Sequence, residues 1–588
     1  MGPQRPKIIS NTERSKSPII AQDRSLLPLE RPSRIETRVD TRPCFASSWI
    51  ETPEISADEI LAKYSISGVR VLVAAPRNAS YGIYAVDPPE YHLGHHQLQI
   101  MADALKDLTD SIPAGIETRS LTLARPYIKG KAKSRIYADL ASGKDPRVSG
   151  SELEKDADRL SELLCKYTAG FGTMETLLED ATVQDIYIDA PSSQIPIHVV
   201  LRSDAVEGVR QKCRTNIFVG RRDLQGFVSR VKFETGLPFS EAHPVLEADM
   251  RMLDSRVTLV GPPLSEKGVS VAIRKHSRGI WTMPALIANG SISPLLSSFL
   301  WACVIGRRTV LIAGSRGAGK TTLLGAMLLE FPLSQRIILI EDTPEIPSSR
   351  MQSLGYDMQS LRFSSDTESG SVSAEESLRV SLRMGESAIV IGEVRGREAK
   401  VLYESMRAGS AGSAVLGTIH GNSAKGVLDR AVEDLGVTER AFSSTDLVAV
   451  IGLVRSPDGS RFYRRVTEVA EVRWTGSHAE LVNLFATEPG CKCAKPTPEF
   501  SAQSRTIGGV ASALGMRTDE TMEIIKARAH ADQIASEDPR SRCHGTKEDS
   551  DRFRVLSNEV LMRALFTAAE TETALREWRT WFDESDAR

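Results

Sequence analysis

A glycine-rich turn between an apolar run and a helix-forming run limits the fold more than any other feature. Thr309–Ala313 is typical of a buried strand, and Thr322–Glu330 is typical of a helix. Between them stands Gly314-Ser-Arg-Gly-Ala-Gly-Lys-Thr321, which follows the pattern GxxxxGK[ST]. Strand, loop and helix in this order predict an α/β domain with a parallel sheet, whose loop N–H groups point inward and bind phosphate oxygens.

The residues of this turn have distinct expected roles. Lys320 is expected to contact the β and γ phosphates of ATP, and the Thr321 hydroxyl to bind Mg²⁺. The alternative is a glycine-rich turn with a surface lysine, but the pattern arises by chance in only roughly a few per cent of chains this long. The flanking strand and helix favour nucleotide binding. The predicted cofactor-binding residues of the turn are Gly314, Ser315, Arg316, Gly317, Ala318, Gly319, Lys320, Thr321 and Thr322.

Acidic residues follow two further apolar runs. Arg336–Ile340 leads into Glu341, Asp342 and Glu345, and Ala388–Ile391 leads into a second acidic segment that contains Glu393 and Arg395. Hydrolysis needs one acidic group to organise Mg²⁺ and another to position the attacking water. Because the carboxyl ends of parallel strands meet at one edge of a sheet, we expect both segments near the phosphates.

A fourth apolar run, Ala414–Ile419, brings His420 to the same predicted edge. There it is expected to hydrogen-bond the γ-phosphate. A single histidine is more often a structural residue. Its place as a fourth polar group at a strand end favours function.

Composition excludes several classes of protein. The 588 residues are 41% hydrophobic and 26% charged, which predicts about three or four domains. Lys plus Arg (74) nearly balances Asp plus Glu (76), so no bulk positive field draws the chain to nucleic acid.

The longest apolar stretch, Ile292–Ile305, is too short to span a bilayer and predicts a buried helix. The N-terminus lacks a secretory pattern, and seven scattered cysteines suit a reducing cytoplasm.

The chain divides by pattern into five segments. Residues 1–50 are rich in Arg, Pro and Ser and predict a disordered basic arm. Strand-like runs such as Val69–Ala75 and Val183–Ile188 predict two small α/β domains, at 51–150 and 151–280. Alternating helices and apolar strands predict an ATPase domain at 281–490. The segment 491–588 is polar and mainly helical, with an amphipathic run at Phe553–Leu565.

The four strand-end motifs together resemble the type II/type IV secretion ATPase superfamily. In the family's order they are a Walker A loop (GSRGAGKT, 314–321), an Asp box (IEDTPEI, 340–346), a Walker B motif (IVIGEVRG, 389–396) and a His box (GTIHGNS, 417–423). The amino-acid sequences of these motifs are most similar to those of the archaeal branch, which includes pilus and archaellum motors. The resemblance covers roughly residues 150 to 475.

The resemblance implies a fold and a set of roles. The fold is a RecA-like P-loop NTPase domain with a mostly parallel sheet, preceded by smaller α/β N-terminal domains and followed by a helical C-terminal tail. Glu345 would polarise the attacking water, and Glu393 would hold the Mg²⁺ shell through waters. Glu341 and Asp342 would support them, and Arg395 completes the cofactor-binding set.

Two arginines of the preceding domain are further candidates. Arg256 and Arg274 match arginines that the family brings towards the nucleotide. A planar guanidinium suits a phosphate, but both positions also suit ordinary exposed strand arginines. The family implies a homohexamer, with ATP in a cleft between the N-terminal and RecA-like domains.

The resemblance therefore implies an ATP-hydrolysing motor of a type II secretion or type IV pilus-like assembly system. Its expected partner is a polytopic membrane platform protein, and its expected location is the cytoplasm, peripheral at the inner face of the cytoplasmic membrane. No direct nucleic-acid contact is expected. The alternatives are a DNA conjugation or uptake motor, and a nucleotide-binding assembly protein without turnover. The cargo and the direction of filament movement stay open.

Many bacterial secretion ATPases carry a four-cysteine zinc module in the C-terminal domain, and this sequence lacks that pattern. Cys491-Lys-Cys493 is a CxC rather than the CxxC pair of zinc ribbons, and Cys543-His544 lies far downstream. We predict no structural zinc, although these four side chains could meet in space.

Overall fold

The computed structural model describes most of the chain in two compact units, which divide between Lys275 and His276. The described residues are 43, 45–77, 79–110, 121–142, 150–202, 206, 209, 211–276, 279–363, 372–385, 388–396, 398–407, 414–455, 462–488, 493–501, 503–542, 548–568 and 570–585. Most of the predicted N-terminal arm lies outside them, as do Cys491, Cys543 and His544. The predicted absence of a structural zinc site therefore stays a prediction.

The first unit is built on a nine-stranded mixed sheet in the order β2-β3-β4-β7-β6-β5-β11-β10-β9. Strands from both segments expected before residue 280 belong to this one sheet. Its strands are β2 (Ile60–Ile66), β3 (Val69–Ala74), β4 (Gly82–Asp87), β5 (Val183–Ile188), β6 (His198–Leu201), β7 (Lys212–Thr215), β9 (Val245–Met250), β10 (Ser255–Val260) and β11 (Ser270–Lys275), and β1 (Trp49–Ile50) pairs separately with β8 (Ile217–Phe218).

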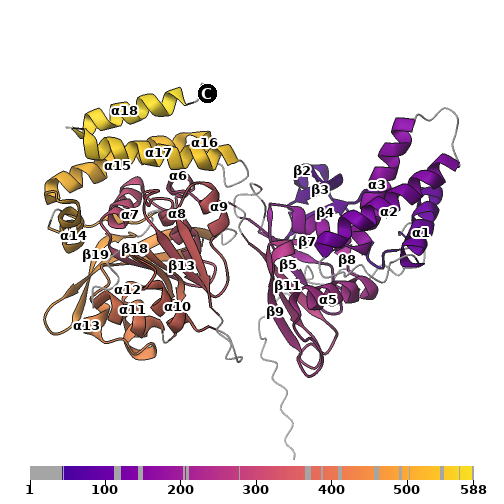
Figure 1. The fold of residues 1–588 in the computed structure, drawn as a ribbon, viewed down its shortest axis with the longest axis horizontal. Helices are drawn as coiled ribbons and strands as arrows, with labels where there is room; N and C mark the ends of the chain where they lie inside the picture. The colour runs from indigo at the N-terminus through magenta and orange to yellow at the C-terminus, as the bar shows by residue number, and fades with distance from the viewer. Residues whose placement is uncertain are drawn as a thin grey trace, which may run out of the picture. The chain divides into compact units, whose positions relative to one another are not determined.

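The helices of this unit pack in two places. One group, α1 (His95–Asp110), α2 (Leu121–Ser142) and α3 (Gly150–Thr168), forms a small core of its own around Met101, Ile136 and Leu160 (Figure 1). The helices α4 (Met174–Glu179) and α5 (Arg221–Thr235) pack against the sheet. The alternation of buried and part-buried residues along β10 is the period-2 pattern of a strand with one covered face.

The second unit is built on a nine-stranded sheet in the order β14-β13-β15-β16-β12-β17-β18-β19-β20. The first six strands of this order are parallel, and the last three add antiparallel. They are β12 (Thr309–Gly314), β13 (Ile337–Glu341), β14 (Met358–Arg362), β15 (Ala388–Val394), β16 (Val415–His420), β17 (Leu447–Arg455), β18 (Phe462–Trp474), β19 (Ala479–Ala486) and β20 (Lys495–Pro496).

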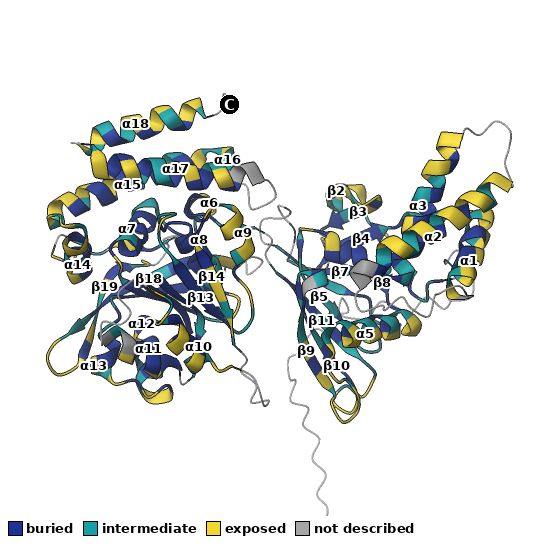
Figure 2. Cartoon of the chain, viewed as in Figure 1, coloured by how far each residue is buried: buried dark blue, intermediate teal, exposed yellow. Residues whose placement is uncertain are grey.

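Helices cover both faces of this sheet, as Figures 1 and 2 show. Alternate residues of β12, such as Ile312 and Leu311, enter two separate hydrophobic cores, because successive side chains of a strand point to opposite faces. One face is covered by α6 (Met283–Ala288), α7 (Pro294–Ile305), α8 (Lys320–Leu328) and α9 (Ser348–Ser353), and the other by α10 (Ala374–Ser381), α11 (Glu398–Arg407), α12 (Ala424–Asp429) with a π-helical turn (Arg430–Asp434), and α13 (Glu439–Phe442).

A helical extension packs on the α7 side of the sheet (Figure 1). The guanidinium of Arg528 is almost fully buried, lies 4.4 Å from the centre of the Trp301 ring and pairs with Glu330. The extension consists of α14 (Arg505–Leu514), α15 (Thr518–Glu537), α16 (Pro539–Arg542), α17 (Glu548–Thr567) and α18 (Thr571–Glu584). The predicted α/β class, with a mostly parallel sheet followed by a helical tail, is confirmed.

The apolar stretch Ile292–Ile305 is the buried helix α7, as predicted. Within the described ranges, we find no helix whose length and apolar character would let it cross a bilayer.

Candidate nucleotide site

The glycine-rich turn links the central parallel strand to a helix, as the sequence predicts. Strand β12 ends at Gly314 and helix α8 begins at Lys320. Gly317 and Gly319 have φ angles of 76° and 102°, a backbone region that residues with a side chain rarely adopt. A Cβ atom at Gly314 would collide with the carbonyl oxygen of Ile451 in β17. These glycines are therefore required by the path of the loop.

Lys320 is buried and lies along this loop. Its ammonium group donates hydrogen bonds to the carbonyl oxygens of Gly314 and Ser315, both at 3.2 Å. The remaining predicted phosphate contacts, Arg316, Ala318 and Thr322, belong to the same loop and to the first turn of α8. The Lys320 ammonium group is thus held within the phosphate-binding turn.

The Asp box approaches the loop from the end of β13. Thr321 Oγ1 donates a hydrogen bond of 2.6 Å to Glu345 Oε2. Glu341 is buried, and its Oε1 accepts backbone N–H bonds from Glu345 (3.1 Å) and Ile346 (3.2 Å). Burial raises the pKa of Glu341 to about 8, although these two N–H donors act in the opposite direction. Glu341 thus holds the segment that presents Glu345.

The Walker B and His-box residues meet beside the loop. His420 ends β16 opposite Gly314 of β12. His420 Nε2 lies 2.8 Å from Glu393 Oε1, in a contact without hydrogen-bond geometry. Burial lowers the pKa of His420, while the charge of Glu393 acts to raise it. Arg395 pairs with Glu393 and, at 3.1 Å, with Asp342, so this cation joins the Walker B strand to the Asp box.

The two candidate arginines of the first unit lie side by side. Arg256 of β10 and Arg274 of β11 are direct cross-strand partners, so their side chains share one face of the sheet. Aspartates lie opposite them on the next strands, Asp249 facing Arg256 and Asp185 facing Arg274. Arg256 also pairs with Glu247 at 3.1 Å. Their approach to a nucleotide stays a prediction.

The sequence motifs missed one arginine of the site. Arg464 of β18 donates from Nε to the carbonyl oxygen of Gly317 at 3.0 Å. It reaches the turn because β18 pairs with β17, which lies beside β12. No motif marks this residue, and only the register of the antiparallel hairpin, which local patterns do not fix, brings it there.

The residues present fit a magnesium-bound nucleotide. The Thr321 hydroxyl and the carboxylates of Glu345 and Glu393 supply oxygen atoms, the donor type that Mg²⁺ prefers. Lys320 supplies charge for the phosphates, and the left-handed glycines supply a loop that can follow them closely.

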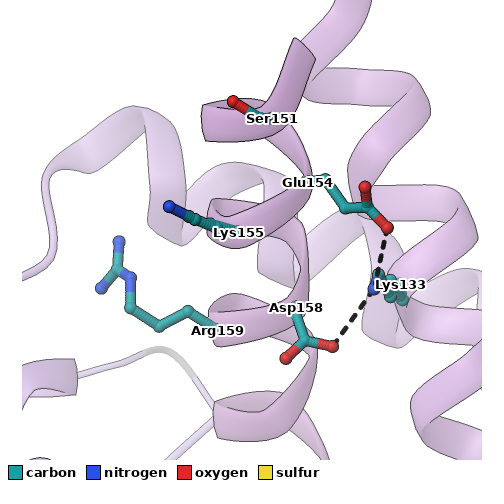
Figure 3. Close-up of a pocket in the computed structure, with 6 residues that line it drawn as sticks. All are labelled: Lys133, Ser151, Glu154, Lys155, Asp158 and Arg159. Atoms are coloured by element: carbon teal, nitrogen blue, oxygen red, sulfur yellow. Dashed lines mark ion pairs between the residues drawn. The ribbon is translucent and has the colours of Figure 1, made fainter. Parts of the chain in front are cut away.

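A surface hollow on helix α3 offers no comparable chemistry (Figure 3). Lys133 Nζ lies 3.6 Å from Glu154 Oε1 and 3.3 Å from Asp158 Oδ1. These charges pair with one another on an exposed surface, which favours a solvated helix–helix contact. Ser151, Lys155 and Arg159 complete its lining.

Comparison with known proteins agrees with the motifs. A family described as "Type II/IV secretion system protein" matches residues 168–552. An "Uncharacterized protein" of Methanocaldococcus jannaschii is 31% identical over 42% of this chain and 87% of its own length. A "Putative conjugal transfer protein" of Mycobacterium tuberculosis is 28% identical over 55% of this chain and 90% of its own length. The X-ray structure of the Yersinia pseudotuberculosis ATPase DotB covers 61% of this chain and 89% of its own, with 17% identity and a TM-score of 0.37.

Proposed function

Because the chain belongs to the type II/IV secretion system protein family, we propose that it is the ATP-hydrolysing motor of a type II secretion or type IV pilus-like assembly system. The observation that carries this proposal is the meeting of four strand-end motifs at one edge of the sheet. Thr321 contacts Glu345 at 2.6 Å, and Glu393 lies 2.8 Å from His420. Such an edge is where open parallel sheets bind their ligands.

Each residue has a role in this proposal. Lys320 binds the β and γ phosphates, and the Thr321 hydroxyl and Glu393 hold Mg²⁺, Glu393 through waters. When bound, Mg²⁺ neutralises charge that develops on the phosphate oxygens. Glu345 accepts a hydrogen bond from the attacking water and polarises it. His420 contacts the γ-phosphate.

The motor is proposed to produce mechanical work when its contacts with the γ-phosphate are lost on hydrolysis. Contacts of Lys320 and His420 with a γ-phosphate exist only before hydrolysis, so their loss changes the preferred conformation of the motor. We propose a homohexamer at the inner face of the cytoplasmic membrane, acting on a polytopic platform protein. Arg256 and Arg274 are proposed to reach the nucleotide from the N-terminal part of the chain.

Phosphate release from ATP tests the proposal. We expect the purified chain to release phosphate only with Mg²⁺, and Glu393→Gln to slow release by roughly 10²-fold or more, because the neutral amide no longer organises the cation. Glu404→Gln is the matched control, since Glu404 is exposed on α11. Absence of turnover in the wild type would refute the motor and favour an assembly protein that only binds nucleotide.

A DNA conjugation or uptake motor is the second candidate, favoured by the name of the mycobacterial relative. Such a motor would use the same site on a different machine. A direct nucleic-acid translocase is a separate alternative, and stimulation of ATP hydrolysis by single- or double-stranded DNA would support it. The formal net charge of −2 argues against it, and we expect no stimulation.

A further inference from the structure

We propose that helix α17 of the C-terminal extension positions the Asp box for catalysis, with Asp551 acting through Arg350 to keep Glu345 beside Thr321. The inference rests on the proposed ATPase function and deepens it. It assigns a positioning role to the helical tail, which lies outside the four motifs.

The first contact joins α17 to the helix that follows the Asp box. Helix α9 begins at Ser348, three residues after Glu345. Arg350 of α9 donates from Nε (3.1 Å) and Nη2 (2.9 Å) to Oδ2 of Asp551. The Asp551 side chain is 5% exposed and that of Arg350 is 20% exposed. Two charge-assisted bonds to one buried carboxylate fix α9 more firmly than a solvated surface pair would.

The second contact joins α17 to the far end of the helix that starts at the phosphate-binding loop. Asn558 Nδ2 donates to the carbonyl oxygen of Leu329 at 3.2 Å, at the C-terminal cap of α8. Just beyond, the backbone N–H of Leu333 donates to Glu559 Oε1 at 2.9 Å. Asn558 is buried. The same face of α17 therefore holds α8 as well as α9.

These contacts close a ring of interactions with the site. At one end, Thr321 on the first turn of α8 bonds to Glu345. At the other end, α17 ties the end of α8 to α9 through Asn558 and Asp551. Helix α8 has nine residues, so the two ends lie about 13 Å apart. A shift of α9 on α17 therefore moves the loop that carries Glu345 relative to the phosphate-binding turn.

Loss of the Asp551 charge tests the role. We expect Asp551→Asn to lower kcat for ATP hydrolysis about tenfold, because misplacement of a reacting group by about 1 Å is costly. The KM for ATP and the affinity for a fluorescent ATP analogue should stay within about twofold, since Lys320 and its loop are untouched. Asp551→Glu, which keeps the charge, should recover part of kcat.

A surface pair on the same extension provides the control. Arg579 and Asp583 form an exposed ion pair of 2.8 Å on α18, so Asp583→Asn should leave kcat unchanged. A kcat for Asp551→Asn equal to that of Asp583→Asn would overturn the inference. So would an effect on KM alone.

Hydrogen exchange separates this inference from the proposed function. The amides of Glu345 and Ile346 are bonded to Glu341, so a loosened Asp box should exchange faster over residues 342–353 in Asp551→Asn. Unchanged exchange there would overturn the positioning role even in a chain that hydrolyses no ATP. A wild type without turnover but with this faster exchange in the variant would refute only the ATPase function.

Discussion

The carboxyl group of Glu341 lies where strand β13 gives way to the loop that carries Glu345. Its Oε1 accepts two backbone N–H bonds, and Oε2 is buried without a hydrogen-bond partner among the described residues. Desolvation outweighs those bonds, so the pKa of Glu341 rises to about 8. In the protein without nucleotide, this group is thus mostly protonated at neutral pH.

The protonation of Glu341 predicts a pH-dependent stability. Between its ordinary pKa of 4.5 and about 8, the folded chain keeps a proton that the unfolded chain has released. The free energy of unfolding should therefore fall as pH rises through this window, by at most about 1.4 kcal/mol per pH unit. Urea unfolding without nucleotide or Mg²⁺ at pH 5.5, 6.5 and 7.5 would measure this. Glu341→Gln should flatten the slope, and an equal slope in both proteins would contradict the assignment.

At the scale of single elements, the phosphate-binding loop shows two different uses of glycine. Gly314 has the Ile451 carbonyl oxygen where a Cβ atom would lie, so any side chain there must displace β17. Gly317 faces open space but has a left-handed φ of 76°. Gly314 is therefore restricted by the neighbouring strand β17, and Gly317 only by its own backbone conformation.

This difference predicts unequal effects of the same substitution. Gly317→Ala should cost about 1–2 kcal/mol of stability, the price of a left-handed alanine. Gly314→Ala should cost more, about 3 kcal/mol or above, because a backbone oxygen cannot move aside as a flexible side chain can, and overpacking costs about 1–3 kcal/mol or occasionally more. It should also weaken nucleotide binding. Thermal unfolding and titration with a fluorescent ATP analogue would compare them. Equal losses would show that the contact with Ile451 relaxes freely.

Local patterns predicted the elements better than their long-range contacts. The apolar runs at Val183–Ile188 and Thr309–Ala313 became β5 and β12, and the amphipathic run at Phe553–Leu565 became part of α17. Parallel strands have a common polar edge, which is why Glu345 and His420 could be placed near the loop. Arg464 and Asp551 could not, because strand register and helix docking depend on residues far along the chain.

At the scale of the whole molecule, the candidate residues are divided between two compact units. The motif residues all belong to the second unit, whereas Arg256 and Arg274 belong to the first. Like charges directly opposite each other in a sheet are destabilising, and the two arginines are such a pair. Asp249 and Asp185 flank them and reduce this cost. Two neighbouring guanidinium groups of this kind suit the binding of an anionic phosphate.

Removal of one of these arginines tests their proposed part in catalysis. We expect Arg274→Ala to lower kcat by roughly 10²-fold or more, as loss of a cation that stabilises a transferring phosphoryl group does. The thermal unfolding temperature should change little, because the repulsion in the pair is relieved. Arg70→Ala is the matched control, since Arg70 is an exposed strand arginine paired with Asp87. Similar activity in both variants would leave Arg274 as an ordinary surface residue.

The position of β12 between β16 and β17 has a consequence for how the chain is made. Both neighbours emerge from the ribosome only after about 100 to 130 further residues, a delay of roughly 5–25 s at ordinary rates of translation. Throughout that interval the apolar strand Thr309–Gly314 has two unpaired edges, a known template for aggregation. We therefore expect nascent chains of this protein to need chaperones or early helix packing until β17 has emerged.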